Sequence, residues 1–240
     1  MHPYLNQQLQ PPTTPDPEAP SQNNTPPEIQ TLGGSRHLGK TGSGKSSLGN
    51  TLFGENTFTV GHTPYSETKL CQSETGVING RKIRLVDTPG VFDTDNDNDE
   101  TKARLMRSIV ECAPGPHAFL LVMKIDRYTT QEKMVVEQIL KTFSEEVLRF
   151  TTIIFTRGDD LQDSEKIKDW ANQNEDLRVL LQKCGGRCHV FDNKYWNNSQ
   201  DPYRNNTVQV TELLETIGRT VEENGGTFYT NEMLETSRPI

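Results

Sequence analysis

Eight consecutive residues, 39–46 (GKTGSGKS), fit the phosphate-loop pattern G-x-x-x-x-G-K-[ST] at every fixed position. Such a loop wraps a phosphate group in backbone N–H donors, and its glycines give the close approach and the positive φ angles that this requires. Lys45 then places an ammonium group against the β- and γ-phosphate oxygens, and the Ser46 hydroxyl can ligate Mg²⁺. A flexible Gly/Ser linker has a similar composition, so the downstream sequence must decide between the two interpretations.

The pattern predicts phosphate contacts both from the loop and from the first turn of the helix that should follow it, over residues 46–52. The N-terminus of a helix carries a partial positive charge and free N–H groups, which favour a bound anion. The candidate phosphate-binding residues are Gly39, Thr41, Gly42, Ser43, Gly44, Lys45, Ser46 and Ser47.

An acidic residue follows the second arm of a predicted β-hairpin. The arms, residues 70–78 and 82–86, flank Asn79-Gly80, which supplies the two positive φ angles of a type I′ turn. The second arm continues into Asp87-Thr88-Pro89-Gly90. A strand that ends in Asp is the second half of a phosphate-loop site, because that Asp holds Mg²⁺, often through water. We therefore expect Asp87 at the metal and the Gly90 N–H at a γ-phosphate.

A third motif predicts a contact with the base of a nucleotide. A predicted buried strand, residues 150–155, ends in Thr156-Arg157-Gly158-Asp159, which fits the pattern [NT]-[KR]-x-D. In that pattern the Asp carboxylate accepts hydrogen bonds from N1–H and N2–H of guanine. Adenine lacks this pair of donors, so the box favours GTP over ATP. A further short strand, residues 188–191, ends at Asp192-Asn193, and a loop at this position can back the guanine base.

The order of the predicted elements favours an α/β fold: a three-layer, doubly wound, mostly parallel sheet with a phosphate loop, that is, a G domain. A further strand is predicted at residues 116–125, and helices are predicted at residues 101–112, 129–143, 165–183 and 207–223. Ligands of such sheets bind outside the carboxyl ends of the strands. All three boxes lie at such ends, which supports a shared nucleotide site.

The segment before the phosphate loop departs from this pattern. Residues 31–38 (TLGGSRHL) lack the apolar run of a buried strand that should feed the loop, so we expect the first strand to be poor or missing. Residues 1–31, rich in Pro, Gln, Asn and Thr, predict a disordered tail. The G domain is then expected over residues 32–224, and residues 225–240 are expected to form a polar C-terminal tail.

The composition of the chain argues against several classes of partner and several cellular locations. The chain has 240 residues and a net charge of −8, which argues against a nucleic-acid or anionic-membrane surface. It has no run of about 18 apolar residues and no signal-peptide pattern. Its four cysteines have no zinc-site spacing and are expected to be reduced, buried thiols. We therefore expect a cytoplasmic protein without a membrane anchor.

Five stretches together have the pattern of a known family: residues 39–50 (GKTGSGKSSLGN), 87–92 (DTPGVF), 115–122 (GPHAFLLV), 155–161 (FTRGDDL) and 224–235 (NGGTFYTNEMLE). On these residues the chain resembles the GTPase of immunity-associated protein (GIMAP) family, relatives of the septins and of the chloroplast import GTPases. The resemblance extends over about residues 39–235, and the Gly-Pro-His sequence at residues 115–117 is a marker of that family.

The resemblance implies roles for residues in each of these stretches. It implies that Ser46 binds Mg²⁺ and that Thr68, in the sequence SETKLC, is the switch threonine, also a metal ligand with Asp87. It implies that Asp159 reads guanine and that Asn193 contributes. The family also forms nucleotide-dependent dimers across the nucleotide face, which implies a homodimer or oligomer here. Where the family has an apolar first strand, this chain has residues 33–37.

Hydrolysis is a separate question from binding. Val91 stands where Ras-like proteins have a water-orienting Gln, and an apolar side chain cannot orient water. We therefore expect a guanine-nucleotide-binding switch with GTP/GDP and Mg²⁺ as ligands, slow GTP hydrolysis, and no catalytic residue that the sequence singles out. The alternatives are a phosphate-loop ATPase or kinase, and a scaffold derived from a G domain that binds no nucleotide.

Overall fold

A computed structural model describes residues 28–32, 44–58, 72–87 and 115–230. The strands are β1 (Glu28–Leu32), β2 (Gln72–Ile78), β3 (Arg81–Asp87), β4 (Ala118–Lys124), β5 (Thr151–Thr156) and β6 (Cys188–Phe191). The helices are α1 (Lys45–Phe53), α3 (Thr130–Phe143), α4 (Ile167–Asn172), α5 (Glu175–Lys183) and α6 (Asn206–Glu223). Short 3₁₀ turns lie at η1 (Glu145–Phe150), η2 (Gly158–Asp160) and η3 (Trp196–Asn198).

The strands form one six-stranded sheet in the order β2-β3-β1-β4-β5-β6. Every neighbouring pair is parallel except β2 and β3, which form the predicted hairpin. Asn79 and Gly80 have φ angles of 48° and 77°, as the type I′ turn requires. The predicted fold class, a doubly wound and mostly parallel sheet, is confirmed.

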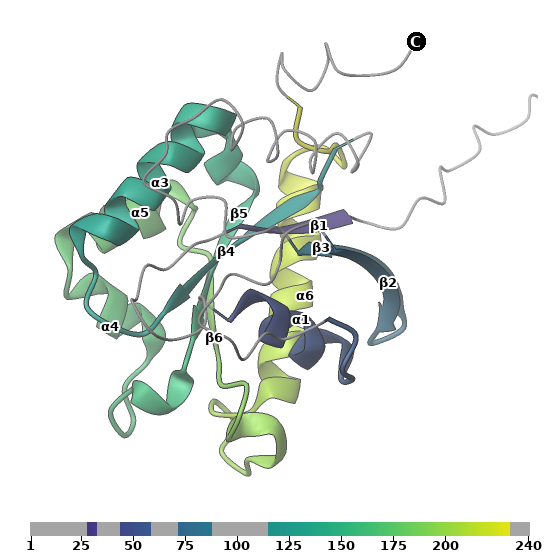
Figure 1. Cartoon of the computed structure of the whole chain (residues 1–240), viewed down its shortest axis with the longest axis vertical. Helices are drawn as coiled ribbons and strands as arrows, with labels where there is room; N and C mark the ends of the chain where they lie inside the picture. Colours follow the sequence, from purple (N-terminus) through teal and green to yellow (C-terminus); the bar gives the residue numbers. More distant parts are fainter. Residues whose placement is uncertain (1–27, 33–43, 59–71, 88–114, 231–240) are drawn as a thin grey trace, which may run out of the picture.

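The first strand is present and occupies the centre of the sheet. β1 (EIQTL) pairs in parallel with β3 on one side and with β4 on the other (Figure 1). Hydrogen bonds to two neighbours hold a segment whose own sequence has little strand pattern, because pairing in a central strand satisfies the backbone on both sides. The prediction of a tail was therefore wrong for residues 28–31, and the sheet has its central member.

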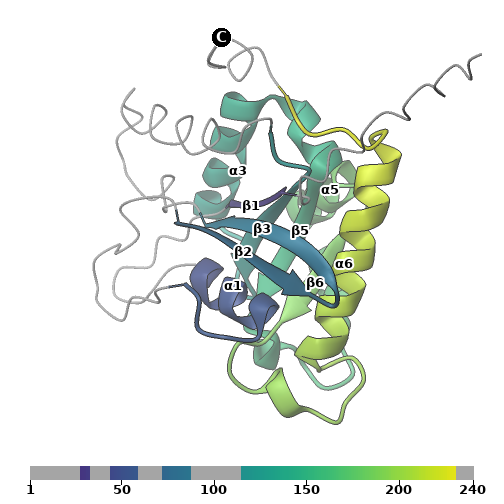
Figure 2. The ribbon, with the colours of Figure 1, turned by 90° about the vertical axis from the view of Figure 1, so that its right-hand side faces the viewer.

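The sheet is covered on both faces, which gives the three layers (Figures 1 and 2). Successive side chains of a strand point to opposite faces. Phe119 and Leu121 of β4 accordingly pack in the core beneath α3, α4 and α5. Leu120 and Val122 pack in the other core, beneath α1 and α6. Because both faces are buried, β4 is a continuous apolar run rather than an alternating one.

One long predicted helix, residues 165–183, is two shorter helices in the structure. α4 ends at Asn172, and Asn174 adopts an extended conformation before α5. The Asn174 side chain accepts a hydrogen bond from the Leu177 N–H at 3.0 Å, which caps the new helix. The other helices described lie within one or two residues of their predicted bounds, and no helix among the described residues has the length and apolar composition needed to span a membrane.

The segment that follows α6 belongs to the core rather than to a polar tail. Tyr229 is 1% exposed, its ring packs edge-on against Phe119, Phe143 and Phe150, and its hydroxyl donates a hydrogen bond to the Phe143 carbonyl. The Tyr229 N–H donates to the Pro116 carbonyl at 2.8 Å. The predicted boundary at residue 225 is therefore wrong for Tyr229.

The Gly-Pro-His sequence forms the other side of this contact. A Cβ atom on Gly115 would lie 2.4 Å from the Tyr229 carbonyl oxygen, and Gly115 has a φ of 145°, so only glycine fits. The His117 ring meets the Phe228 ring edge-on at 6.1 Å, and burial lowers the pKa of His117. These contacts give His117 a structural role beside the segment that follows α6.

Candidate functional site

The helix that follows the phosphate loop begins at the edge where the parallel strands end. Gly44 immediately precedes α1 and has a φ of 86°, in the left-handed region that favours glycine. Its carbonyl accepts the Leu48 N–H at 2.8 Å, which starts the helix. Lys45 and Ser46 lie in the first turn of α1, where the N–H groups and the helix dipole favour an anion.

This helix N-terminus lies against the ends of β5 and β6. A Cβ atom on Gly44 would lie 3.4 Å from the Thr156 methyl carbon and 3.5 Å from the Asn193 amide nitrogen. The Thr51 hydroxyl, on the next turns of α1, donates to the Asn193 side-chain oxygen at 2.8 Å. The structure therefore brings the end of the phosphate loop together with Thr156 and Asn193, two residues predicted for the base-binding side.

The turn after β5 is shaped so that Asp159 stays at the surface. The buried Thr156 hydroxyl donates to the Met123 carbonyl of β4 at 3.2 Å. Arg157 has a φ of 65° and its guanidinium pairs with Asp160 at 2.9 Å. A Cβ atom on Gly158 would lie 2.4 Å from the buried Trp196 ring, so glycine allows this turn to lie flat on the ring. Asp159 follows as an exposed side chain.

The loop after β6 is organised by a buried carboxylate. Asp192 is 2% exposed, and its Oδ1 accepts the N–H groups of Lys194 and Tyr195 at 2.9 and 2.5 Å. The Asn206 side chain donates to the Asp192 carbonyl at 2.7 Å and accepts the Asp192 N–H at 3.2 Å. These bonds fix the loop that carries Asn193 to the first residue of α6.

The two loops also meet at Asp159 and Asp192, where the Asp159 N–H approaches Asp192 Oδ2 at 3.5 Å. The neighbouring Asp192 carboxyl, with some burial and the charges of Asp192 and Asp160, raises the pKa of Asp159 to about 6. Burial alone would raise the pKa of Asp192, but hydrogen bonds from Asp159, Tyr195 and Lys194 outweigh it and lower that pKa.

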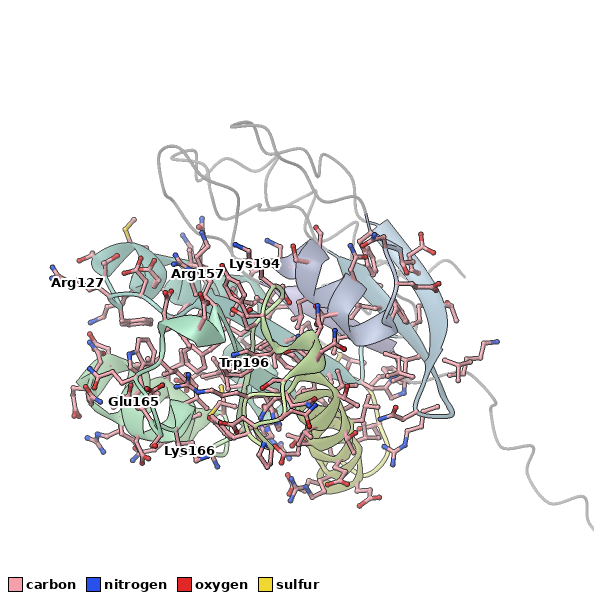
Figure 3. All side chains as sticks on the ribbon, turned by 90° about the horizontal axis from the view of Figure 1, so that it is seen from below. Arg127, Arg157, Glu165, Lys166, Lys194 and Trp196 are labelled. Atoms are coloured by element: carbon pink, nitrogen blue, oxygen red, sulfur yellow. The ribbon has the colours of Figure 1, made fainter. Side chains whose placement is uncertain are left out.

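In the view of Figure 3, the labelled side chains of Arg157 and Lys194 project from the same side of the molecule, and Trp196 lies below them in the picture. The Lys194 ammonium lies 4.6 Å from the centre of the Tyr195 ring. This edge thus carries polar and charged side chains, with the buried Trp196 ring under Gly158 and the exposed Tyr195 ring beside the Lys194 ammonium.

A magnesium ion would find suitable donors at the same edge. Ser46 lies in the first turn of α1, and Asp87 is the last residue of β3, with its Cα paired to that of Thr31, the residue before the last one of β1. Because β1, β3 and β5 are parallel, their carboxyl ends lie along one edge of the sheet. A hydroxyl and a carboxylate are hard oxygen ligands of the kind that Mg²⁺ prefers, so these two residues fit the ion.

Several predicted site residues lie outside the described residues. They are Gly39, Thr41, Gly42, Ser43, Thr68 and Gly90, together with Val91 and the predicted helix over residues 101–112. Of the residues that the structure describes, Thr51, Asp192 and Trp196 belong to the site although the sequence did not single them out. Asp192 stands next to a predicted residue, but nothing in the local sequence signals Thr51 or Trp196, because their partners are distant in the chain.

Comparison with known proteins places these observations in a family. The sequence profile of the AIG1 family matches residues 37–239. GTPase IMAP family member 8 of Homo sapiens is 34% identical over 201 residues, which make up 84% of this chain and 29% of that protein. Immune-associated nucleotide-binding protein 1 of Arabidopsis thaliana is 30% identical over 201 residues, 82% of this chain and 87% of that protein. The chain thus spans less than a third of the human relative.

Solved structures show the same fold. Toc33 from Arabidopsis thaliana in complex with GDP and Mg²⁺ superposes with a TM-score of 0.62 and 20% sequence identity, covering 82% of this chain and 84% of that chain. A dimerization-deficient mutant of Toc33 gives a TM-score of 0.63, also at 20% identity. At this identity the likeness concerns the fold alone.

Proposed function

We propose that this chain, which belongs to the AIG1 family, is a guanine-nucleotide-binding switch that hydrolyses GTP slowly with Mg²⁺ and associates with itself in its GTP state. One observation carries the proposal. Three segments far apart in the sequence come together at the carboxyl edge of the sheet, where a Cβ atom on Gly44 would lie within 3.5 Å of both Thr156 and Asn193. This edge is where doubly wound folds bind nucleotides.

Each part of the edge has a role in this proposal. Lys45 and the N–H groups of the first turn of α1 bind the phosphates, and Ser46 and Asp87 hold Mg²⁺. The ion, when bound, neutralises charge on the phosphate oxygens. The remaining predicted residues of the phosphate loop, with Gly90, surround the phosphates, and Thr68 is a further metal ligand that responds to the γ-phosphate. Toc33 has been crystallised with GDP and Mg²⁺ and with GMPPNP and Mg²⁺, which supports this choice of ligands.

Base selectivity depends on Asp159. An ionised carboxylate accepts two hydrogen bonds side by side, and guanine offers N1–H and N2–H in that arrangement. Adenine presents N1 as an acceptor there, so it would oppose one lone pair with another. Thr156 and Arg157 set the direction of the turn, and Asn193 backs the base from the β6 loop. These features support GTP over ATP.

Slow turnover and self-association complete the proposal. Val91 cannot orient an attacking water, so this position does not supply the group that the corresponding Gln supplies in Ras-like proteins. A second copy meeting the nucleotide face would supply it. For chloroplast translocon components, dimerization is described as important for GTPase activity. We also propose a cytoplasmic location, supported by the free, buried thiols of Cys184 and Cys188, since reduced cysteines persist in reducing compartments.

The scaffold alternative has lost its main argument. It depended on a missing first strand, whereas β1 pairs with β3 and β4 at the centre of the sheet. The ATPase or kinase alternative remains a matter of base selectivity and is decided by competition between nucleotides.

The experiment is equilibrium binding of fluorescent GTP and GDP with Mg²⁺, in the presence of excess ATP. We expect binding that ATP does not displace and that Lys45→Ala abolishes, because the phosphates lose their cation. Lys183→Ala is the matched control: Lys183 lies on α5 and pairs with Glu145 on the exposed surface, so this variant should bind normally. Displacement by ATP would favour the ATPase, and no binding by folded protein would favour the scaffold.

A further inference from the structure

One segment, residues 196–205 between β6 and α6, contacts the turn that carries Asp159 on both sides of that residue. The first contact precedes Asp159: a Cβ atom on Gly158 would lie 2.4 Å from the buried Trp196 ring, so the backbone of the turn lies directly against the ring. The second contact follows Asp159 and is made by Arg204. Together the two contacts fix the backbone from which the Asp159 side chain projects.

The Arg204 guanidinium binds two consecutive carbonyl groups. Its Nη2 donates to the Leu161 carbonyl oxygen at 3.0 Å and to the Gln162 carbonyl oxygen at 2.6 Å. Its Nη1 lies 3.5 Å from the Asp163 carboxylate. The Asp163 side chain is fully exposed, and ion pairs with such groups are weak in water. The two carbonyls are therefore the main partners of Arg204.

The backbone around Arg204 is held in place by contacts of its own. The N–H groups of Tyr203 and Arg204 donate to the Asp201 carboxylate at 2.8 and 3.1 Å. The Tyr203 hydroxyl accepts the N–H of Ile167, the first residue of α4, at 2.8 Å. The centres of the Tyr203 and Trp196 rings lie 6.4 Å apart. Because these contacts do not involve the guanidinium, its removal should release the end of the turn and leave residues 196–205 in place.

We propose, on the basis of the function proposed above, that Arg204 is a positioning residue for guanine recognition: by holding the two carbonyls that follow the Asp159 turn, it keeps the Asp159 carboxylate in line with N1–H and N2–H of guanine. Two parallel hydrogen bonds to one carboxylate need both of its oxygens in a fixed direction. A turn that is free at one end has this geometry for only part of the time. In its released state the phosphates still bind, but the base is read poorly.

The preference for GDP over inosine diphosphate (IDP) isolates this role. The base of IDP has N1–H but lacks the 2-amino group, so the two ligands differ by one hydrogen bond to the carboxylate. We expect wild type to prefer GDP by about tenfold or more, which is the size of one hydrogen bond to a charged group. A loss of folded protein raises both dissociation constants by the same factor and leaves their ratio unchanged.

Arg204→Met should weaken this preference. Methionine keeps an unbranched, flexible side chain and removes every donor. We expect GDP affinity to fall about tenfold, and the preference for GDP over IDP to fall to about threefold or less. Arg204→Lys keeps the charge on a shorter side chain with a single nitrogen, so its preference should lie between those of wild type and Arg204→Met.

Arg187→Met is the matched control, because Arg187 makes the same kind of contact at the opposite edge of the sheet. Its guanidinium donates to three carbonyl groups at 2.8 to 3.0 Å, those of Leu148, Arg149 and Thr151. Its side chain is 14% exposed, against 20% for Arg204, and it too has an exposed acidic neighbour, Glu223 at 3.7 Å. Arg187→Met should lower the free energy of unfolding but keep the wild-type preference for GDP.

The experiment measures the dissociation constants of GDP and IDP by competition against fluorescent GDP with Mg²⁺. It compares wild type, Arg204→Met, Arg204→Lys and Arg187→Met. Circular dichroism and urea unfolding of each protein without nucleotide show whether it is folded. We expect the preference for GDP to decrease in the order wild type, Arg204→Lys, Arg204→Met, and to be unchanged in Arg187→Met.

The outcomes are separable. A wild-type preference in folded Arg204→Met or in Arg204→Lys overturns the role of Arg204 and leaves the proposed function intact; Arg204→Lys decides alone if Arg204→Met fails to fold. An equal loss of preference in Arg187→Met overturns it as well, because any loosening of the fold would then have this effect. No GDP binding by folded wild type overturns the proposed function and this inference together.

Discussion

The two edges of the sheet are packed differently, although each contains one glycine that lies against a neighbouring segment. At the carboxyl edge, loops after β5 and β6 are joined by polar contacts around Asp192, and Asp159 is left exposed. At the amino edge, Tyr229 is buried among aromatic rings and closes the core. One glycine at each edge, Gly158 and Gly115, leaves no room for a Cβ atom. The first edge keeps groups available for a ligand, and the second stabilises the domain.

This comparison predicts that substitutions at the two edges change different measured quantities. Changes at the carboxyl edge should alter nucleotide affinity, with a loss of folding free energy only where the changed residue is tightly packed, as at Gly158. Changes at the amino edge should lower the free energy of unfolding and leave affinity unchanged. The cases below run from the largest expected effect to the smallest.

Asp159→Asn should give the largest change, a switch of base specificity. The amide oxygen still accepts N1–H, but its NH₂ group opposes the guanine N2–H donors and instead matches the C2 carbonyl of xanthine. We expect GDP affinity to fall by at least about a hundredfold, since hydrogen bonds to a charged group contribute about 1.5–3 kcal/mol each. Competition binding with GDP and XDP measures the effect.

The control for this variant is Asp163→Asn, which makes the same chemical change on a fully exposed side chain four positions away and should leave GDP affinity unchanged. The thermal midpoint of Asp159→Asn should also be close to that of wild type. Equal preference for GDP in Asp159→Asn and wild type would show that Asp159 does not read the base.

Tyr229→Ala should produce the largest loss of stability. The ring packs against Phe119, Phe143 and Phe150, and replacing such a buried aromatic side chain typically costs about 3–5 kcal/mol. Urea unfolding followed by circular dichroism measures this loss, and GDP binding is measured at a temperature where the variant is folded. A normal free energy of unfolding would mean that residues beyond α6 do not belong to the core.

The elements that could be predicted are those whose own residues carry the pattern. The apolar run of β4, the Asn79-Gly80 turn and the three motif boxes each identify themselves within a few residues. β1 could not be predicted this way, because its stability comes from β3 and β4 on either side. Tyr229 was missed for a related reason: two adjacent aromatic residues, Phe228 and Tyr229, in an otherwise polar stretch give no sign of the distant rings against which Tyr229 packs.

The residues of the candidate site also fall into those that the sequence predicts and those that it does not. Asp159 and Asn193 follow buried strands, so their position at the carboxyl edge follows from the sequence. Thr51 contacts Asn193 across 142 positions of the chain, and Trp196 contacts Gly158 through packing that only the folded loops create. Long-range contacts of this kind leave no local pattern, so the sequence predicts the candidate residues at the ends of the strands but not the residues that pack beneath or beside them.

Gly158→Ala tests whether the carboxyl edge depends on close packing as well as on charge. A Cβ atom would lie 2.4 Å from the Trp196 ring, which is buried and cannot move aside freely. Overpacking of this kind typically costs about 1–3 kcal/mol. Because Asp159 is the next residue, we expect GDP affinity to fall as well, by about tenfold, when both quantities are measured.

Gly115→Ala is the matched variant at the other edge. Its Cβ atom would also lie 2.4 Å from the nearest atom, the Tyr229 carbonyl oxygen, so a similar loss of stability is expected. Nucleotide affinity should stay within about twofold of wild type, since the contact lies at the amino end of β4. A comparable loss of GDP affinity in both glycine variants would mean that the two edges are coupled.

Thr51→Val should have the smallest effect, confined to binding. The Thr51 hydroxyl has one proton and two acceptors in reach, the Ser47 carbonyl at 3.0 Å and the Asn193 oxygen at 2.8 Å. Valine keeps the shape but loses the link between α1 and the β6 loop, so GDP affinity should fall about fivefold, which corresponds to one hydrogen bond of about 1 kcal/mol. Thr142→Val is the control, because Thr142 on α3 makes the same bond to the carbonyl four residues earlier, at 2.9 Å, far from the candidate site. If both variants bind GDP equally well, the Thr51–Asn193 contact supports the fold of the loop and not its ligand.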